Sequence, residues 1–573
     1  MALFLILLDP DAERRAVFAR ALPAPLPGLA RGTCASGPLF ASWDLFPGAP
    51  VSSVADDAGA AVLWGEAIPG PGPARADAGA IRAADDLGAF DGYFAAAAYD
   101  PGAGLRVAGD LLGIFPIYWW AGGGVLLCGS SPEPFRAHPL FRARLDPRGL
   151  AGILLTHGLV AGCTLLAGVA RLGPGERLHA RPGEAPRVLV ASVLKADEAL
   201  ARAPFGEQIE ALDAALAGAV GRHVGDGRAL GMLLSGGRDS RLLAGYVRER
   251  GLAPPALTLG RRGDHEATCA GAVARAARLR HIVDDIAPGG YGAFAERAAN
   301  LEHCGHGLSL LHSWGSIDCV RGLAPRALGG YLMDASLGGS LVVAGAPSFD
   351  RDLARLHAWG IAPAALRGLL RKELFGNAVD ETIEALRVAW SSRTADRARH
   401  LYTDNRHRFN TGGPIWRHAF GSWPVLPLLD RHLAAVAFSL PFTTVAGRRA
   451  EDEILRRRFP DLARLPLDRN GPDLSPILPT RSWRFRLRWR RRLARRGVER
   501  RRFFRVMDFD GPGWREVRAR AEPERARRAD WFVPGALDAL LPRAEATVAS
   551  AELPATAGMR ALLLLLLWAR DRF

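Results

Sequence analysis

The chain has 573 residues, which is enough for two or more domains that each bury a full core. Apolar residues make up 49% of it, as in an ordinary globular protein, and the formal net charge is +15. The positive charge is almost entirely arginine, which fits a codon bias better than a function, although a basic surface still favours acidic partners.

The cysteines and the apolar runs argue against disulfide-rich, secreted and membrane-spanning classes of protein. The six cysteines form no CxxC pair, so reduced thiols are expected instead of a disulfide framework. The opening MALFLILLD has no basic segment before it and is too short for a signal peptide. The run Leu562–Trp568 is well under the length of a membrane span. We therefore expect a cytoplasmic protein without a membrane span.

Residues 1–195 alternate short apolar runs with Gly/Pro turns, a pattern typical of antiparallel sheets. Because each run is only four to seven residues long, strands are favoured over helices. The runs are Leu3–Leu8, Ala61–Trp64, Tyr93–Tyr99, Leu105–Ala108, Ile117–Trp120 and Val125–Cys128.

Three motifs in this part resemble the glutaminase domain of asparagine synthetases. They are FDGYFAAAAYD at 90–100, DLLGIFPIY at 110–118 and SSPEPFRAHP at 130–139. The resemblance implies an α+β, Ntn-hydrolase-like αββα sandwich for residues 1–195. It also implies an α/β synthetase domain with a parallel sheet and an ATP-pyrophosphatase loop for residues 200–573.

Two departures from that family predict that the first domain is a degenerate glutaminase. The family's nucleophile is an N-terminal cysteine exposed by loss of the initiator methionine, and position 2 here is Ala2. The family's Asn-Gly-Glu, whose asparagine helps to form the oxyanion hole, reads Trp64-Gly65-Glu66. The domain is therefore expected to fold without releasing ammonia from glutamine.

The stretch after Arg228 carries the most specific motif. Leu230–Leu234 is an apolar run fit for a buried strand, and a helical repeat of apolar residues ends at Gly251. Between them, the bare N–H groups of a glycine loop and a helix N-terminus form an anion site. The loop resembles the ATP-pyrophosphatase loop, so the expected ATP contacts are Leu234, Ser235, Gly236, Gly237, Asp239 and Ser240, with Asp239 also expected to bind Mg²⁺.

Further candidates follow from the same resemblance. Ala256–Leu259 is the next expected strand, and the family places adenine contacts at its end, here Thr258 and Leu259. The segment from Gly330 to Gly339 aligns with the family's GxGxDxxxGG, which makes Gly330 an ATP contact and Asp334 the second Mg²⁺ carboxylate. Tyr331 stands where β-lactam-forming members have a catalytic tyrosine, although a packing role fits a tyrosine at a strand end as well.

The C-terminal part holds three weaker signals. The family's EVR block is absent, and Arg469 is the nearest cation to the place of its phosphate-binding lysine. The basic and aromatic stretch Arg481–Arg505 fits an acidic peptide, a membrane surface, a nucleic acid or a solvated helix face. The histidines and cysteines between His303 and Cys319 match no zinc-binding pattern.

The resemblance therefore implies an ATP- and Mg²⁺-dependent ligase that adenylates a carboxylate and releases AMP and pyrophosphate. Without a glutaminase, the amine belongs to the substrate itself, as in lasso-peptide macrolactam cyclases. The implied partners are a precursor peptide, a leader peptidase and a leader-binding protein, with no nucleic acid. A β-lactam or carbapenam synthetase, an ammonia-dependent asparagine synthetase and, in another class, a nucleotide-binding scaffold without catalysis remain as alternatives.

Overall fold

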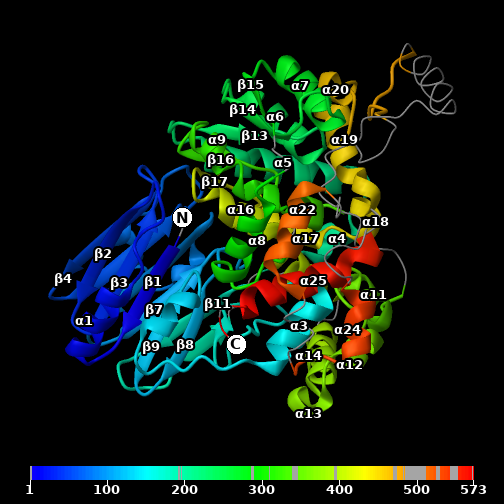
Figure 1. Ribbon diagram of the computed structural model, residues 1–573. Helices are drawn as coiled ribbons and strands as arrows, with labels where there is room; N and C mark the ends of the chain where they lie inside the picture. The colour runs from blue at the N-terminus through cyan, green and yellow to red at the C-terminus, as the bar shows by residue number, and fades with distance from the viewer. Residues whose placement is uncertain are drawn as a thin grey trace.

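A computed structural model describes residues 3–190, 194, 196–285, 289–308, 310–338, 346–392, 397–468, 474–481, 483, 511–523, 530–541, 553–570 and 572. Figure 1 shows an N-terminal layered β-structure beside a largely helical C-terminal part. Within the described ranges, no helix is long and apolar enough to cross a membrane, and all six cysteines are free.

Two antiparallel six-stranded sheets form the N-terminal part within the described residues. In spatial order the first contains β10 (Ala170–Arg171), β8 (Tyr118–Gly122), β9 (Val125–Gly129), β1 (Leu3–Leu8), β3 (Leu39–Leu45) and β2 (Ala30–Ser36). The second contains β12 (Arg187–Val190), β11 (Glu176–Ala180), β7 (Gly104–Gly109), β6 (Phe94–Asp100), β5 (Gly59–Gly65) and β4 (Val51–Asp56).

The two sheets pack face to face because residues alternate between their faces. Ile6 of β1 and Val62 of β5 belong to one shared core, whereas Leu7 and Leu63 point to the outer faces. Helix α2 (Ala78–Ala83) covers the outer face of the second sheet. The antiparallel sandwich agrees in general terms with the predicted α+β architecture.

A parallel five-stranded sheet, counted within the described residues, organises the second part. Its order is β15 (His281–Asp285), β14 (Ala256–Gly260), β13 (Gly231–Leu233), β16 (Arg326–Leu328) and β17 (Trp423–Val425). Met232 packs in the main core beside α5, α6 and α7, and Leu233 packs on the opposite face with Val320 of α9. Burial of both faces explains why these strands read as continuous apolar runs.

The helices complete the architecture. In chain order they are α1 Ala12–Ala21, α2, α3 Pro147–Thr156, α4 Glu198–Arg202, α5 Phe205–Val224, α6 Asp239–Glu249, α7 His265–Ala277, α8 Tyr291–Asn300, α9 Ile317–Arg321, α10 Met333–Ser336, α11 Phe349–His357, α12 Pro363–Leu369, α13 Lys372–Phe375, α14 Ala378–Ser391, α15 Arg397–Leu401, α16 Gly412–His418, α17 Arg431–Ser439, α18 Phe442–Val445, α19 Arg449–Arg458, α20 Pro460–Ala463, α22 Pro512–Arg520, α24 Pro534–Leu540 and α25 Leu553–Ala569. Short 3₁₀ turns are η1 Leu87–Ala89, η2 Glu133–Ala137, η3 Leu311–Trp314, η5 Pro427–Leu429 and η6 Ala446–Arg448, and η4, Tyr402–Thr411, is a π-helix.

The apolar run near the C-terminus is a buried helix. In α25, Leu562–Trp568 packs against α3 and α8 and shares a core with the outer face of the first sheet. The end of the chain thus covers the N-terminal sandwich, which accounts for a run of leucines in a short helix.

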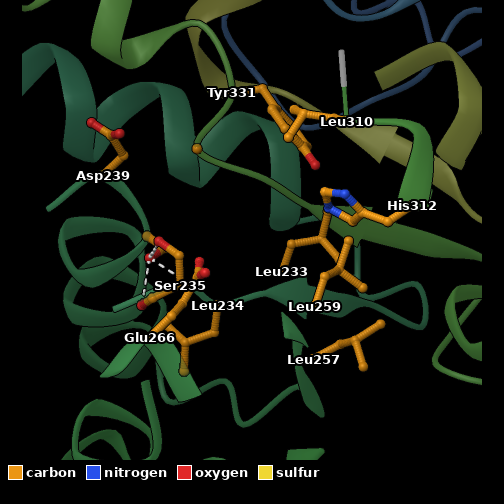
Figure 2. A pocket seen from close by; sticks show the side chains of 12 residues that line it. Leu233, Leu234, Ser235, Asp239, Leu257, Leu259, Glu266, Leu310, His312 and Tyr331 are labelled. Carbon is orange, nitrogen blue, oxygen red and sulfur yellow. Dashed lines mark hydrogen bonds between the residues drawn. The ribbon is translucent and has the colours of Figure 1, made fainter. Parts of the chain in front are cut away.

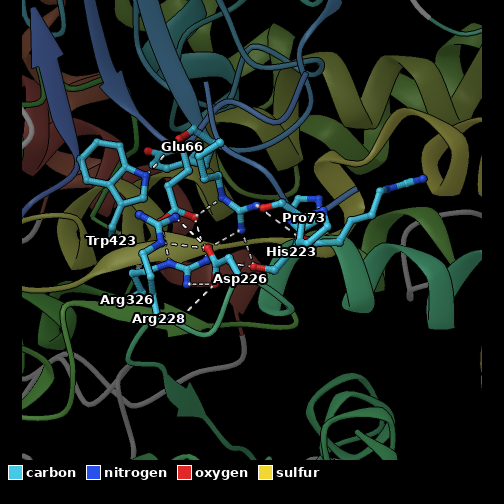
Figure 3. A network of polar contacts seen from close by, with 10 residues as sticks. Glu66, Pro73, His223, Asp226, Arg228, Arg326 and Trp423 are labelled. Atoms are coloured by element: carbon cyan, nitrogen blue, oxygen red, sulfur yellow. Dashed lines mark hydrogen bonds and ion pairs between the residues drawn. The ribbon is translucent and has the colours of Figure 1, made fainter. Parts of the chain in front are cut away.

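A buried charge network joins the two parts. Glu66, which follows β5, accepts hydrogen bonds from Arg228 and Arg326 of the second part, both at 2.9 Å. Asp226 accepts from Arg326 at 2.8 Å and lies 3.2 Å from Arg75 of the first part (Figure 3). Glu66 and Arg326 are both buried, so the network fixes the sandwich against the parallel sheet.

Candidate functional site

The loop between β13 and α6 is braced by its own serines. The Ser235 backbone N–H donates to the Ser240 hydroxyl at 3.0 Å, and the two hydroxyl oxygens lie 2.9 Å apart. The Gly237 N–H donates to Ser235 Oγ at 3.2 Å. A Cβ at Gly236 would lie 2.8 Å from the Cys269 Cβ and 2.9 Å from the Asp468 Cβ, so only glycine fits there.

A pocket of about 250 Å³ opens beside this loop. In Figure 2, Tyr331 and His312 lie at one end of it, and Ser235 and Glu266 lie together at another. Its lining residues are Leu233, Leu234, Ser235, Asp239, Ser240, Leu257, Leu259, Glu266, Leu310, His312, Gly330 and Tyr331. The leucines offer an apolar surface for a planar ring, and the loop offers N–H groups for an anion.

Most of the residues predicted to contact ATP lie on this pocket, and a few lie behind it. Gly236, Gly237 and Thr258 are absent from the lining. The Thr258 hydroxyl is buried and donates to the Leu234 carbonyl oxygen at 2.6 Å, so this side chain supports the loop from below. A Cβ at Gly330 would lie 2.8 Å from the Asp239 Cβ, so the glycine allows these two segments to approach closely.

The two predicted metal carboxylates converge on one cation, Arg448. Its guanidinium contacts Asp239 at 2.5 Å and Asp334 with its other terminal nitrogen. The same side chain is 2.8 Å from Glu451, whose carboxyl is fully buried. Two hard oxygen donors around one cation are the donor set that suits Mg²⁺, so Asp239 and Asp334 fit the ion.

Arg448 belongs to a segment that closes over the loop. Gly447 and Arg448 both have left-handed backbone angles, φ 62° and φ 66°, at the start of α19. One turn later Asp452 accepts a hydrogen bond of 2.5 Å from the Arg238 Nε of the loop. The carboxylates of Asp239 and Asp334 and the loop arginine are therefore all held by residues 448–452.

Tyr331 reaches the pocket with its hydroxyl beside His418. The Tyr331 Oη and the His418 Nδ1 are 3.4 Å apart. Burial raises the pKa of Tyr331, and burial with His312 and Arg417 nearby lowers the pKa of His418 to about 3. The imidazole is thus neutral at neutral pH and lies within hydrogen-bond distance of the phenol.

The helix end that carries His418 is held by a buried ion pair. Arg417 forms a fully buried, bidentate ion pair with Glu302 at 2.6 and 2.9 Å. The Trp314 indole N–H also donates to Glu302, at 2.8 Å. These contacts fix the end of α16 and therefore the direction of the His418 side chain.

The pocket also contains a carboxyl group with an unusual proton affinity. Burial, reinforced by the carboxylates of Asp468 and Asp264, raises the pKa of Glu266 to about 8. Glu266 is therefore protonated at neutral pH and can donate a hydrogen bond, and it becomes a base just above neutrality.

We expect this carboxyl to make stability depend on pH. Since the pKa is raised from 4.5, the folded chain binds more protons than the unfolded chain between about pH 4.5 and pH 8, and this contribution to stability falls as pH rises. Glu266→Gln removes this pH dependence. The free energy of unfolding of the variant minus that of the wild type should therefore be about 1 to 3 kcal/mol larger at pH 8.5 than at pH 6. Urea unfolding at both pH values measures this. Glu13→Gln, on the exposed face of α1, is the control, and equal pH slopes for all three proteins would contradict it.

Two of the histidines from His303 to Cys319 contact carboxylates. His303 Nδ1 lies 2.7 Å from a Glu133 carboxylate oxygen, and His306 Nδ1 lies 3.0 Å from one of Glu302. Within the part of the chain that the structure describes, no group of three or more His, Cys, Asp or Glu residues could hold a metal ion.

The position of the family's oxyanion asparagine is filled by an aromatic cluster. Trp64 is buried and stacks on Phe4 with ring centroids 4.5 Å apart, and Trp43 meets its edge at 6.2 Å. Ala2 lies outside the described residues. A side chain of this size places an apolar core where the resemblance predicts a polar donor.

Two predicted features cannot be placed. Arg469 lies outside the described residues, as does most of Arg481–Arg505. Their expected roles remain predictions.

The second part of the chain matches a known protein family. Residues 211–423 match the family model described as asparagine synthase. This match covers the loop, the pocket and the strands β13, β14, β15 and β16, and in general terms it supports an asparagine synthetase-like, ATP-dependent ligase. A search of curated proteins gives no match.

Two solved structures are also similar in part. One is described as the allosteric regulatory enzyme of purine biosynthesis, with 10% identity, a TM-score of 0.23, and coverage of 51% of this chain and 82% of that one. The other is the glutamine phosphoribosylpyrophosphate amidotransferase from B. subtilis with ADP and GMP, with 10% identity, a TM-score of 0.22, and coverage of 58% and 82%.

Arg448 and His418 had no sequence signal of their own. His312 belongs to the group between His303 and Cys319, which the sequence presents only as a candidate metal site. Glu266 lies in Asp264-His265-Glu266, a segment that resembles the start of a family helix and that a solvated helix start explains equally well. Glu266 lies in the first turn of α7, the helix that follows β14 of the parallel sheet, and this position beyond the carboxyl end of a strand could have singled it out.

Proposed function

We propose that this protein is an AMP-forming ligase that activates a carboxylate with ATP and joins it to an amine. The observation that carries the proposal is the convergence of Asp239 and Asp334 on one cation beside the serine-braced loop. A scaffold that only binds nucleotide has no need of two carboxylates at the phosphate end of the pocket.

The reaction has two steps. A substrate carboxylate oxygen attacks the α-phosphorus, pyrophosphate leaves, and an acyl-adenylate forms. An amine nitrogen then attacks the acyl carbon, AMP leaves, and the nitrogen loses one proton. Holding both reactants in one pocket raises their effective concentration by roughly five orders of magnitude or more.

The residues divide this work. The loop N–H groups hold the phosphates, and Mg²⁺ on Asp239 and Asp334 would neutralise their charge. Tyr331, oriented by His418, directs its phenol into the pocket, where it can donate a hydrogen bond to the acyl oxygen. Glu266 offers a carboxylate for the proton of the amine above about pH 8.

The amine is best supplied by the substrate. Trp64 and Phe4 fill the former glutaminase position, so ammonia from glutamine is not the nucleophile. We therefore favour macrolactam closure of a precursor peptide, in which an Asp or Glu side chain is adenylated and the new N-terminal amine attacks it. Such a lasso-peptide cyclase would act in the cytoplasm with a leader peptidase and a leader-binding protein, and it would serve antibiotic biosynthesis.

A second candidate is a small-molecule β-lactam synthetase. The Tyr331 hydroxyl at the pocket wall is the observation that favours it, because the resemblance assigns β-lactam-forming members a catalytic tyrosine at this position. The pocket volume of about 250 Å³ leaves a small substrate as reasonable as a peptide side chain.

Mass spectrometry separates the two candidates. The protein is incubated with ATP, Mg²⁺, a candidate precursor peptide and its leader peptidase. Loss of one water from the core peptide supports the cyclase. AMP release with a small β-amino acid, and an unchanged peptide mass, would reject the peptide substrate and favour the synthetase. No AMP or pyrophosphate with either substrate would reject the ligase itself.

A further inference from the structure

A second cavity, larger than the first, lies between the N-terminal sandwich and the helical segment. Its volume is about 560 Å³, within the range of small-molecule sites. One wall comes from β8, β10 and the loops around residues 161–176, and the other from α14, α15 and the π-helix η4. None of its lining residues belongs to the pocket at the loop.

Two buried arginines face this cavity. Arg171 is 2% exposed and Arg408 is 3% exposed, and both contact the ring of Phe409, at 4.8 and 5.1 Å. Their hydrogen bonds go to neutral groups: Arg408 Nε donates to the Gly113 carbonyl oxygen at 2.8 Å, and Arg171 donates to Ile114 at 3.1 Å. Among the described residues, neither arginine has a carboxylate within ion-pair distance.

Each guanidinium also keeps a buried N–H group without an acceptor. These atoms are Arg171 Nε and Arg408 Nη2. Burial and the neighbouring Arg171 lower the pKa of Arg408 to about 9, whereas the carboxylates of Asp404, Glu176 and Asp110 act in the opposite direction. Buried charges in proteins are ordinarily paired, so two like charges at one cavity wall call for an anion.

Asp404, Asp146 and Glu176 also line this cavity. Two of these carboxylates have other tasks: Asp146 caps α3 by accepting from the Arg148 N–H at 2.8 Å, and Glu176 accepts from the Gly173 N–H at 2.6 Å. The wall that carries Arg408 is a π-helix, a rare form that is frequent at functional sites. Asn405 of this helix accepts from the Ala161 N–H at 3.1 Å and ties the two walls together.

We propose that this cavity binds a small molecule through a carboxylate or phosphate group held by Arg171 and Arg408. Planar guanidinium groups match the oxygen pairs of either anion. The site is separate from the proposed ligase chemistry and does not depend on it.

The test is thermal unfolding of the full chain with sodium phosphate and with sodium succinate, each compared with sodium chloride at equal ionic strength. At least one of the two oxyanions should give a saturable rise of about 2 °C or more. The oxyanion that raises the unfolding temperature shows whether the cavity binds a phosphate or a carboxylate group. Arg408→Gln should weaken the response about 10- to 100-fold, since a charge-assisted hydrogen bond is lost.

A second pair of variants leaves both arginines in place. Ala389→Trp, on the exposed rim of the cavity, should fill it and abolish the response, and the exposed neighbour Val388→Trp should keep it. A phosphate response that survives both Arg408→Gln and Ala389→Trp comes from the loop at Ser235 and would overturn the proposal. So would the absence of any oxyanion-specific response in the wild type.

Discussion

Asp239→Asn is expected to lower ATP–pyrophosphate exchange by about 10²- to 10³-fold. The substitution keeps the shape of the side chain and removes the negative charge that holds a cation at the phosphates. Loss of one preorganised electrostatic contact in a reacting site typically costs this much. Because Asp334 contacts the same cation from the other side, Asp334→Asn should show a loss of similar size.

The exchange assay needs a carboxylate substrate that supports adenylation. The control variant is another Asp→Asn substitution, placed away from the pocket. Asp461→Asn removes a surface carboxylate that lies 2.5 Å from the guanidinium of Arg248 in α6, the helix that begins at Asp239. This variant should leave the exchange rate unchanged. Circular dichroism of all three variants checks that they fold. If Asp239→Asn retains more than about a tenth of the wild-type rate, the carboxylate does not serve the phosphates.

The parts of this site that could be predicted are local in sequence. The apolar run before Ser235, the two glycines and the helical repeat after them specify a strand, a loop and a helix, and β13 and α6 have this arrangement. The strands of the sandwich follow from short apolar runs, and β14 begins at Ala256 as expected. In each case a few neighbouring residues contain the whole signal.

What could not be predicted depends on contacts between distant segments. Arg448 reaches Asp239 from 209 residues away, and its left-handed backbone is not written in the identity of an arginine. The Glu302–Arg417 pair beneath His418 joins residues 115 apart. Thr258 is predicted to contact adenine through its backbone, and its hydroxyl has a further role that the sequence did not indicate, since it supports the loop at Leu234.

The N-terminal sandwich is tied to the parallel-sheet part by residues close to Trp64. Trp64 was predicted to abolish an oxyanion site, and in the structure it adds an aromatic contact to the core. Glu66, two residues later, binds arginines of the parallel-sheet part. The sandwich therefore contributes to the stability of the synthetase part whether or not it catalyses anything.

Arg448→Gln is expected to destabilise the protein by about 1 to 3 kcal/mol in the absence of divalent metal. The arginine is the shared counterion of Asp239 and Asp334 and also contacts the fully buried Glu451, so its removal leaves the two aspartates without a cation. Mg²⁺ should restore much of this loss, since the same carboxylates then have a divalent cation. In the wild type the metal must displace a guanidinium, so its stabilisation by Mg²⁺ should be smaller.

Urea unfolding with EDTA and with 10 mM Mg²⁺ (a concentration on the order of a weak carboxylate site's dissociation constant) measures both effects. Arg449→Gln, on the exposed side of the same turn, removes an equal charge and should change neither. A variant that is weakened equally with and without Mg²⁺ would show that Arg448 is only a structural clamp. A variant as stable as the wild type would show that the carboxylates need no cation, which would remove the support that their convergence gives to the ligase proposal.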